Sequence, residues 1–285
     1  MKKIGFAVCG NSGIDYIDHP YDIRVFRSTL LLGDAEYTDY IDISAETFYS
    51  RLKEDPNVSP STAQTATGVM METYETLREE GYTDVVVVTI SSELSGTYEG
   101  AQMAANMVDG IHVHVFDSLS VGYAEAYMIL EAAKMAEEGC DIPEILDRLA
   151  KIRENQGLFV SVDTLKFLVK NGRLSGASGL VGSMLKIKPM LQLTHDGRVE
   201  PLEKIRTRKK AIKRIIEKFL QDHPDEGTEA FILHAHDPKT AEGIRSTLKK
   251  AQNDFGEIPI YPLTPVVGAH AGPDAVAIGW ITKKW

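Results

Sequence analysis

Cysteine is scarce in this sequence, and the two that occur, Cys9 and Cys140, lie far apart in different local patterns. This excludes the disulfide framework of a small secreted protein and fits a reducing compartment. The N-terminal string MKKIGFAVCGN starts like a signal peptide, but its apolar run stops at Gly10 and Asn11. Such a string is typical of a first strand and not of an export signal. We therefore expect a cytoplasmic protein.

Long hydrophobic runs are also missing. No segment approaches the roughly 18 to 20 apolar residues that cross a bilayer, so we expect no integral membrane segment. Basic residues are fewer than acidic ones: the chain has 31 Lys and Arg and 41 Asp and Glu, which gives a net charge of −10. This acidic excess disfavours nucleic acid as the main partner. We expect no cofactor and no metal, because His234 and His236 share a strand face but lack an evident third ligand.

What is present is a chain of 285 residues, which suits two compact domains. The first half alternates strand-like and helix-like segments. Among its predicted strands are residues 4–8, 22–34, 83–91 and 111–118. The run TDVVVVTIS shows no polar alternation, which is typical of a central parallel strand covered on both faces. We predict an N-terminal α/β domain, residues 1–156, built on a doubly wound parallel sheet.

The pattern changes after Gly157. A β-hairpin is predicted with its turn at 195–197, and an amphipathic helix begins at Arg208. A strand from Ile258 and another at 275–282 close the chain, with a loop at 264–275 between them. These elements predict a C-terminal mixed α+β domain, residues 157–285.

The stretch TISSELSGTYEGA, residues 89–101, is rich in hydroxyl groups at a predicted strand-to-helix junction. The carboxyl ends of parallel strands are where doubly wound folds bind ligands. The first turn of the following helix offers free N–H groups to an anion. Capping alone needs one hydroxyl, so four within seven residues favour a ligand site. A second hydroxyl-rich loop, residues 59–68, also precedes a helix, and two such loops can converge on one anion.

These residues alone leave three functions open. A serine esterase or acyl transferase would use Ser92 or Ser95 with His270, although the G-x-S-x-G elbow is absent. A phosphate-ligand binding module would use Arg173 and Arg206, although the G-x-x-x-x-G-K-[ST] loop is absent. A carboxylate site needs only hydroxyl groups, helix N–H groups and His270 as hydrogen-bond donors.

Strings along nearly the whole chain resemble the DegV family, the fatty-acid-binding proteins of bacteria. They are DISAETFYSRL, STAQTA, EEGYTDVVVVTISSELSGTYEGA, VFDS, VDTLKFLVKNGRLSGASGLVGSMLKIKPML, KIRTRKKA and VVGAHAGP. The resemblance implies a two-domain α/β fold with one long-chain fatty acid between the domains and no catalysis of its own. It also implies a separate ATP-dependent kinase subunit as partner, to which the protein presents the fatty-acid carboxylate for acyl-phosphate formation.

Site residues follow from the same resemblance, position by position. The implied carboxylate ligands are Thr62, Ser92 and His270, with Ser91 and Ser95 as close neighbours. Candidates for contact with the acyl phosphate or the kinase are Arg173, Arg206 and Arg208. Apart from the resemblance, a fatty-acid tail needs an apolar tunnel, and the residues that we expect along it are Met128, Phe167, Leu168, Leu180, Met184, Leu185 and Ile187. The same residues would equally suit an ordinary core.

The sequence departs from the family pattern at two positions. The family's first loop is usually T-D-S-T, but here it reads Gly10-Asn11-Ser12-Gly13, so Asn11 replaces an Asp. The family's T-S-Q string reads Thr62-Ala63-Gln64, which removes one hydroxyl group. The second change lies in a loop that the resemblance assigns to the carboxylate. From the two departures we expect either a thinner shell of carboxylate ligands or an altered kinase partnership.

Overall fold

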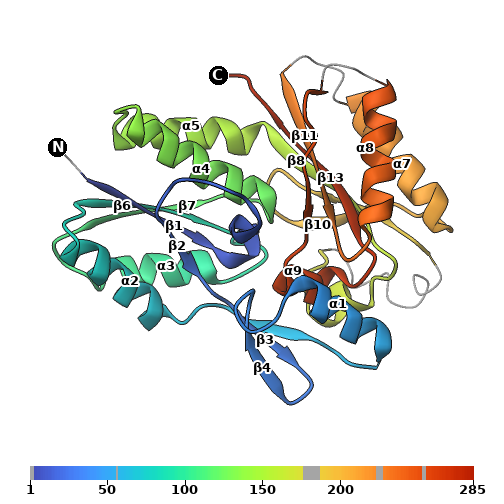
Figure 1. Ribbon diagram of the computed structural model, residues 1–285, viewed down its shortest axis with the longest axis horizontal. Helices are drawn as coiled ribbons and strands as arrows, with labels where there is room; N and C mark the ends of the chain where they lie inside the picture. Colours follow the sequence, from blue (N-terminus) through green and yellow to red (C-terminus); the bar gives the residue numbers. More distant parts are fainter. Residues whose placement is uncertain (1–2, 56, 176–186, 223–226, 252–254) are drawn as a thin grey trace.

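The computed structural model describes residues 3–55, 57–175, 187–222, 227–251 and 255–285. One half of this α/β fold is a four-stranded sheet whose strands all run parallel (Figure 1). Its strand order is β2-β1-β6-β7, with bounds Ile23–Phe26, Ile4–Cys9, Asp84–Thr89 and His112–Asp117. Two 3-10 turns, η1 (Gly10–Ser12) and η2 (Ile14–Tyr16), connect β1 to β2.

Helices cover both faces of the parallel sheet, and the pleat decides which residues meet which helix. Val85 and Val87 pack with α2 (Thr67–Glu79) and α3 (Thr97–Ala105), whereas Val86 and Val88 pack on the other face with α4 (Tyr123–Glu137), which in turn packs against α5 (Ile142–Glu154). A strand buried on both faces has no polar side to show, and this explains the unbroken valine run. The predicted doubly wound sheet is confirmed.

The second sheet is mixed and has six strands in the order β10-β9-β8-β13-β11-β12. Their bounds, in that order, are Val199–Glu203, Met190–Leu193, Gln156–Ser161, Val276–Thr282, Thr228–His234 and Ile260–Pro262. One face packs against α7 (Arg208–Asp222) and α8 (Pro238–Ala251). The other face joins the core around α4, so α4 lies between the two sheets (Figure 1).

The predicted single strand over 22–34 is wrong. After β2 the chain leaves the parallel sheet, and β3 (Thr29–Leu32) pairs with β4 (Ala35–Thr38) and β5 (Ser61–Ala63) in a small antiparallel sheet. Gly33, with φ +63°, and Asp34 form the two-residue turn between β3 and β4. A Gly-Asp turn of this length signals a hairpin, so the sequence did carry the information. Helix α1 (Ala45–Glu54) follows, capped by the Ser44 hydroxyl.

The predicted strand and loop between Ile258 and residue 275 are also partly wrong. Strand β12 ends at Pro262, and α9 (Pro265–Ala271) follows it. The Thr264 hydroxyl accepts a hydrogen bond from the Val267 N–H at 3.4 Å, and Pro265 occupies the first turn. A Thr-Pro start is a helix signal, but two following valines favour a strand. His270 therefore lies in the last turn of a helix. No helix in the described ranges is long and apolar enough to cross a membrane.

Candidate functional site

A cavity lies where the carboxyl ends of the parallel strands face the mixed sheet. Asn11, Ile90 and Val121, which follow β1, β6 and β7, form one wall. The opposite wall comes from the mixed sheet: Leu158, Val160, Leu191, Val199, Leu233 and Ala277. The cavity measures about 150 Å³, roughly ten times the ~10–15 Å³ that one buried water needs. Its position agrees with the rule that doubly wound sheets bind ligands at their carboxyl edge.

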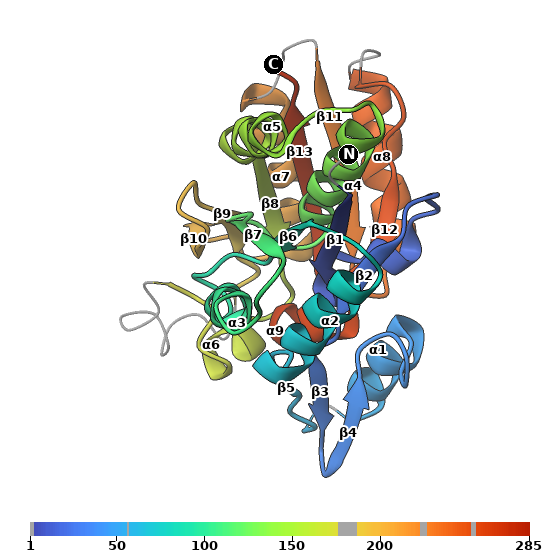
Figure 2. The ribbon, with the colours of Figure 1, turned by 90° about the vertical axis from the view of Figure 1, so that its left-hand side faces the viewer.

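Thr62 and His270 meet at the polar end of this cavity. Thr62 lies on β5, which packs beside α9, the helix that carries His270 (Figure 2). The Thr62 Oγ1 and His270 Nε2 atoms are 2.9 Å apart, and both residues line the cavity. Residues that are 208 positions apart in the chain thus form one hydrogen-bonded pair. Both were expected at the site, and the structure brings them together.

His270 is neutral over the physiological range. Burial, assisted by the positive charge of Arg173, lowers its pKa from 6.5 to about 4. Its other ring nitrogen, Nδ1, is buried and has no hydrogen-bond partner within the described part of the chain. A buried polar atom without a partner costs free energy. A negatively charged ligand beside the ring would recover some of that cost, because it favours the protonated imidazole, whose Nδ1–H can donate a hydrogen bond.

Arg173 supplies positive charge to the cavity. It follows α6 (Lys166–Lys170), a helix that contacts α9. Its Nε donates to the Leu94 carbonyl at 3.0 Å, and its Nη1 donates to the Asn171 carbonyl at 2.6 Å. These bonds fix the guanidinium and leave further N–H groups, since arginine has five. A fixed, partly buried guanidinium on the wall of this cavity is suited to an anion.

The two hydroxyl-rich segments converge at the start of α3. Ser95 and Thr97 line the cavity, and their hydroxyl oxygens are 2.8 Å apart. Gln64 lines it too, and packs against Gly96, where an added Cβ would stand 2.7 Å from the Gln64 Oε1. Only a glycine at position 96 allows this approach. Gln64 and Ser28, which also line the cavity, were not expected as site residues, because only the fold shows which polar side chains of a loop point inward.

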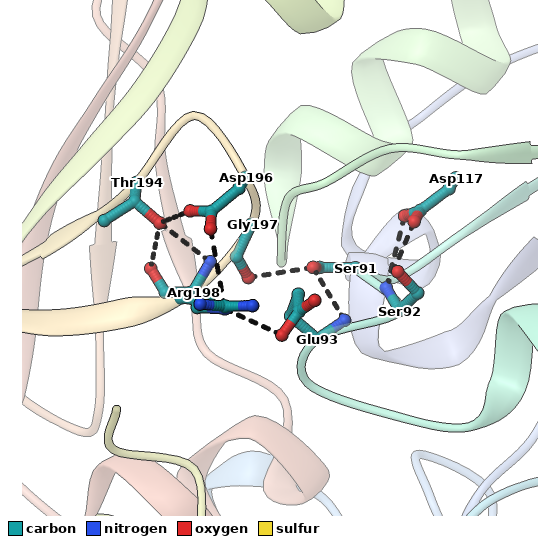
Figure 3. A network of polar contacts seen from close by, with 8 residues as sticks. All are labelled: Ser91, Ser92, Glu93, Asp117, Thr194, Asp196, Gly197 and Arg198. Atoms are coloured by element: carbon teal, nitrogen blue, oxygen red, sulfur yellow. Dashed lines mark hydrogen bonds and ion pairs between the residues drawn. The ribbon is translucent and has the colours of Figure 1, made fainter. Parts of the chain in front are cut away.

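Ser91 is not part of the cavity wall, and its hydroxyl has another role (Figure 3). Its Oγ donates to the Gly197 carbonyl at 2.8 Å and accepts from the Glu93 N–H at 3.2 Å. Gly197 is in the turn of the β9–β10 hairpin, and Arg198 beside it pairs with Glu93 at 2.8 Å. Ser91 therefore joins the strand-end loop to the hairpin. This corrects its expected place beside the ligand.

Ser92 is also absent from the residues that line the cavity. Its backbone N–H donates to the Asp117 carboxylate at 3.2 Å, next to the Ser91 network (Figure 3). The loop turns between Ser92 and Leu94, so that Leu94 and Ser95 line the cavity and Ser92 does not. The four hydroxyls of this segment are thus divided, with Ser95 and Thr97 on the wall and the other two outside it.

The two remaining arginines lie away from the cavity. Arg208 is partly buried and donates to the Asp274 carbonyl and the Asp237 carboxylate, at 2.5 Å each. These bonds tie the start of α7 to neighbouring loops, and the Arg208 side chain stays 28% exposed. Arg206 is exposed just before α7.

The expected tail-lining residues separate into three groups. Leu168 lies on the cavity wall. Met128, Phe167 and Ile187 pack in the main core and are not among the lining residues, because an apolar side chain in a sequence does not reveal whether it faces a core or a cavity. Leu180, Met184 and Leu185 lie outside the described residues.

Asn11, the first departure from the family pattern, is buried on the cavity wall. Its Nδ2 donates to the Glu125 Oε1 at 2.5 Å, and the Gly122 N–H donates to the same oxygen at 2.9 Å. Burial raises the pKa of Glu125 well above its usual value. An amide beside this buried carboxyl avoids the like-charge repulsion that an aspartate would add. Within the described ranges no His, Cys, Asp and Glu side chains gather as a possible metal site.

Known proteins are similar to this chain in both sequence and fold. Residues 15–283 match the family described as "Uncharacterised protein, DegV family". The DegV domain-containing protein SA0704 of Staphylococcus aureus is 34% identical over 272 residues, covering 95% of this chain and 93% of that protein. The crystal structure of the fatty acid binding DegV family protein SAG1342 from Streptococcus agalactiae superposes with a TM-score of 0.91 at 25% identity, covering 100% of both chains. DegV, a fatty acid binding protein from Bacillus subtilis, gives a TM-score of 0.86 at 29% identity, covering 99% of this chain and 100% of that one. This chain belongs to the DegV family.

Proposed function

We propose that this chain binds one long-chain fatty acid, with its carboxylate among Thr62, His270, Arg173 and Ser95 and its tail along the apolar walls. The observation that carries the proposal is the division of one cavity into a hydrogen-bonding, positively charged end and a wall of aliphatic side chains. Two solved DegV proteins with the same fold are described as fatty acid binding, which supports this choice of ligand.

Simple energetics agree with such a ligand. Burying about fourteen methylene groups gains on the order of 11 kcal/mol before the costs of ordering are subtracted. Burying the carboxylate is costly unless it is paired with charge and hydrogen bonds. Arg173 supplies the charge, and the Thr62 and Ser95 hydroxyls supply hydrogen bonds. The binding free energy that a long-chain fatty acid gains by burying its tail therefore exceeds the binding free energy of a small polar acid in the same cavity.

An esterase mechanism has less support. A serine nucleophile needs a base within hydrogen-bonding distance, but the hydroxyl that meets the His270 ring is that of Thr62. Ser95 pairs instead with Thr97. The phosphate-binding alternative needs both Arg173 and Arg206 at one site, but Arg206 is exposed and does not line the cavity. The non-catalytic carrier is thus the function that this geometry favours.

We further propose that the bound carboxylate is presented to a separate ATP-dependent kinase. A carboxylate oxygen would attack the terminal phosphorus of ATP, and ADP would leave as the acyl phosphate forms. Arg173 is the residue on this cavity suited to the added negative charge of the product. The exposed Lys204, Arg206, Lys209 and Lys210 around the start of α7 offer a basic surface to a partner.

The experiment is equilibrium binding after the protein has been stripped of lipid. Palmitate and oleate should bind with one site per chain, whereas ATP and sugar phosphates should produce no thermal shift. A fluorophosphonate probe should leave the serines unlabelled. If neither fatty acid binds to folded, delipidated protein, the proposal is wrong; acyl-ester turnover with serine labelling would replace it with the esterase. The kinase step is tested separately, by trapping acyl phosphate with hydroxylamine when a kinase subunit and ATP are added.

A further inference from the structure

Strand pairing in the mixed sheet locates the far end of the cavity. Residues that pair with one another across β11, β13 and β8 form rows that run across the sheet. The side chains of every second row point to the same face of the sheet. The first such row, all of it on the cavity wall, is Leu233, Ala277 and Val160. Two residues further along, the next row is Phe231, Gly279 and Leu158. Leu158 still lines the cavity, but Phe231 lines a different space, so the cavity ends within this second row.

The ring of Phe231 fills the position where the cavity would continue. It lies directly over Gly279, since a Cβ on that glycine would stand 2.1 Å from the Phe231 Cζ. Tyr123, at the start of α4, packs against the same ring with centroids 4.8 Å apart. Phe231 is only 2% exposed. The two rings therefore form a partition that joins α4 to the mixed sheet.

Beyond the partition lies a groove that reaches the surface. The same two rings line it, together with the partly exposed Tyr127, Tyr261 and Glu229 and the buried Ile281. Tyr261 stacks on Tyr123 with centroids 4.9 Å apart. An aromatic and aliphatic floor of this kind can hold methylene groups. One aromatic layer thus separates the cavity from a second space, whose lining is aromatic and aliphatic next to the partition and also includes Thr228, Glu257 and Lys283.

The polar end of the cavity lies at the opposite end of the rows. Strand β8 continues past Val160 toward α6, and β13 follows α9, and these two helices contact each other. They position Arg173 and His270. A ligand anchored there by its carboxylate would extend along the rows until its methyl end reached Phe231.

We propose that the Phe231 ring, supported by Tyr123 and Gly279, is the end wall that sets the longest acyl chain this protein accepts. The inference rests on the proposed fatty-acid binding. It assigns to Phe231 a specificity-determining role and to the groove a role as latent space for a longer tail. Removing the ring would join the two spaces.

The test is the affinity of delipidated protein for laurate, myristate, palmitate, stearate, arachidate and behenate. In the wild-type protein, affinity should rise with length and then stop rising at a cutoff. In Phe231→Ala the cutoff should move to longer acids, with a gain of about fourfold for each further methylene buried. Ala277→Leu, which fills the row before the wall, should move the cutoff to shorter acids.

The matched control is Ile232→Ala on the same strand. Ile232 is fully buried on the opposite face, against α7 and α8, so its truncation should lower stability and leave the cutoff unchanged. Phe231→Leu gives a milder opening if the alanine variant does not fold. An unchanged cutoff in the folded Phe231 variants would overturn the end-wall inference alone. Absence of binding of every acid to the wild-type protein would overturn the proposed function as well.

Discussion

Replacing Thr62 with Val tests the polar end of the cavity with nearly constant side-chain volume. The valine removes the hydroxyl that lies 2.9 Å from the His270 Nε2 and that would donate to a bound carboxylate. A hydrogen bond to a charged group contributes about 1.5–3 kcal/mol, so the dissociation constant for palmitate should rise about 10- to 150-fold. Stability should also fall, by about 1–3 kcal/mol, because the buried imidazole loses its partner.

Thr65→Val is the matched control for this change. Thr65 lies three residues further along, is 5% exposed, and donates to the Arg27 carbonyl at 2.8 Å without lining the cavity. The control should lose similar stability and keep wild-type affinity in calorimetric titrations with palmitate. An affinity in Thr62→Val within twofold of wild type, in a folded protein, would refute the assignment of Thr62 to the carboxylate.

The remaining predictions concern neighbouring residues. Ser95→Ala should weaken palmitate binding severalfold while Ser92→Ala leaves it unchanged, and the reverse order in the same titration would restore Ser92 to the site. Gly197→Ala should destabilise the protein by at least about 1–2 kcal/mol in urea unfolding, because the residue has φ +82°; wild-type stability would contradict this. The folded pKa of His270, about 4, lies below its ordinary 6.5, so unfolded chains bind more protons between these values and stability is lost as pH falls through that window. The loss should reach about 3 kcal/mol relative to His270→Asn in urea titrations, and equal slopes for both proteins would contradict it.

Sequence patterns predicted the two sheets better than the connections between them. The valine run of β6 and the hairpin turn at residues 195–197 each depend on local periodicity or turn chemistry, and both were correctly located. Helix α9 was missed although Thr264 and Pro265 signal its start, because Val266 and Val267 have strand preference. Tertiary packing decided between two local tendencies that nearly balance.

The candidate site shows the same limit at the level of single residues. Composition drew attention to the segment around Ser91, but it does not distinguish a hydroxyl that joins two loops from one that faces a cavity. That distinction depends on Gly197, 106 residues away in the chain. The Thr62–His270 pair came from the family resemblance, since no local pattern links residues on β5 and α9. The partition at Phe231 follows from strand register and from ring packing, neither of which a local sequence pattern shows.

A native mass spectrum of the protein as purified tests the central claim most directly. A fatty acid buried along the mixed sheet and held by its carboxylate should survive gentle purification. The spectrum should then show the chain with one added mass equal to that of a long-chain fatty acid, and organic extraction should release that acid. A spectrum of the bare chain that gains no mass after incubation with palmitate or oleate would contradict the account.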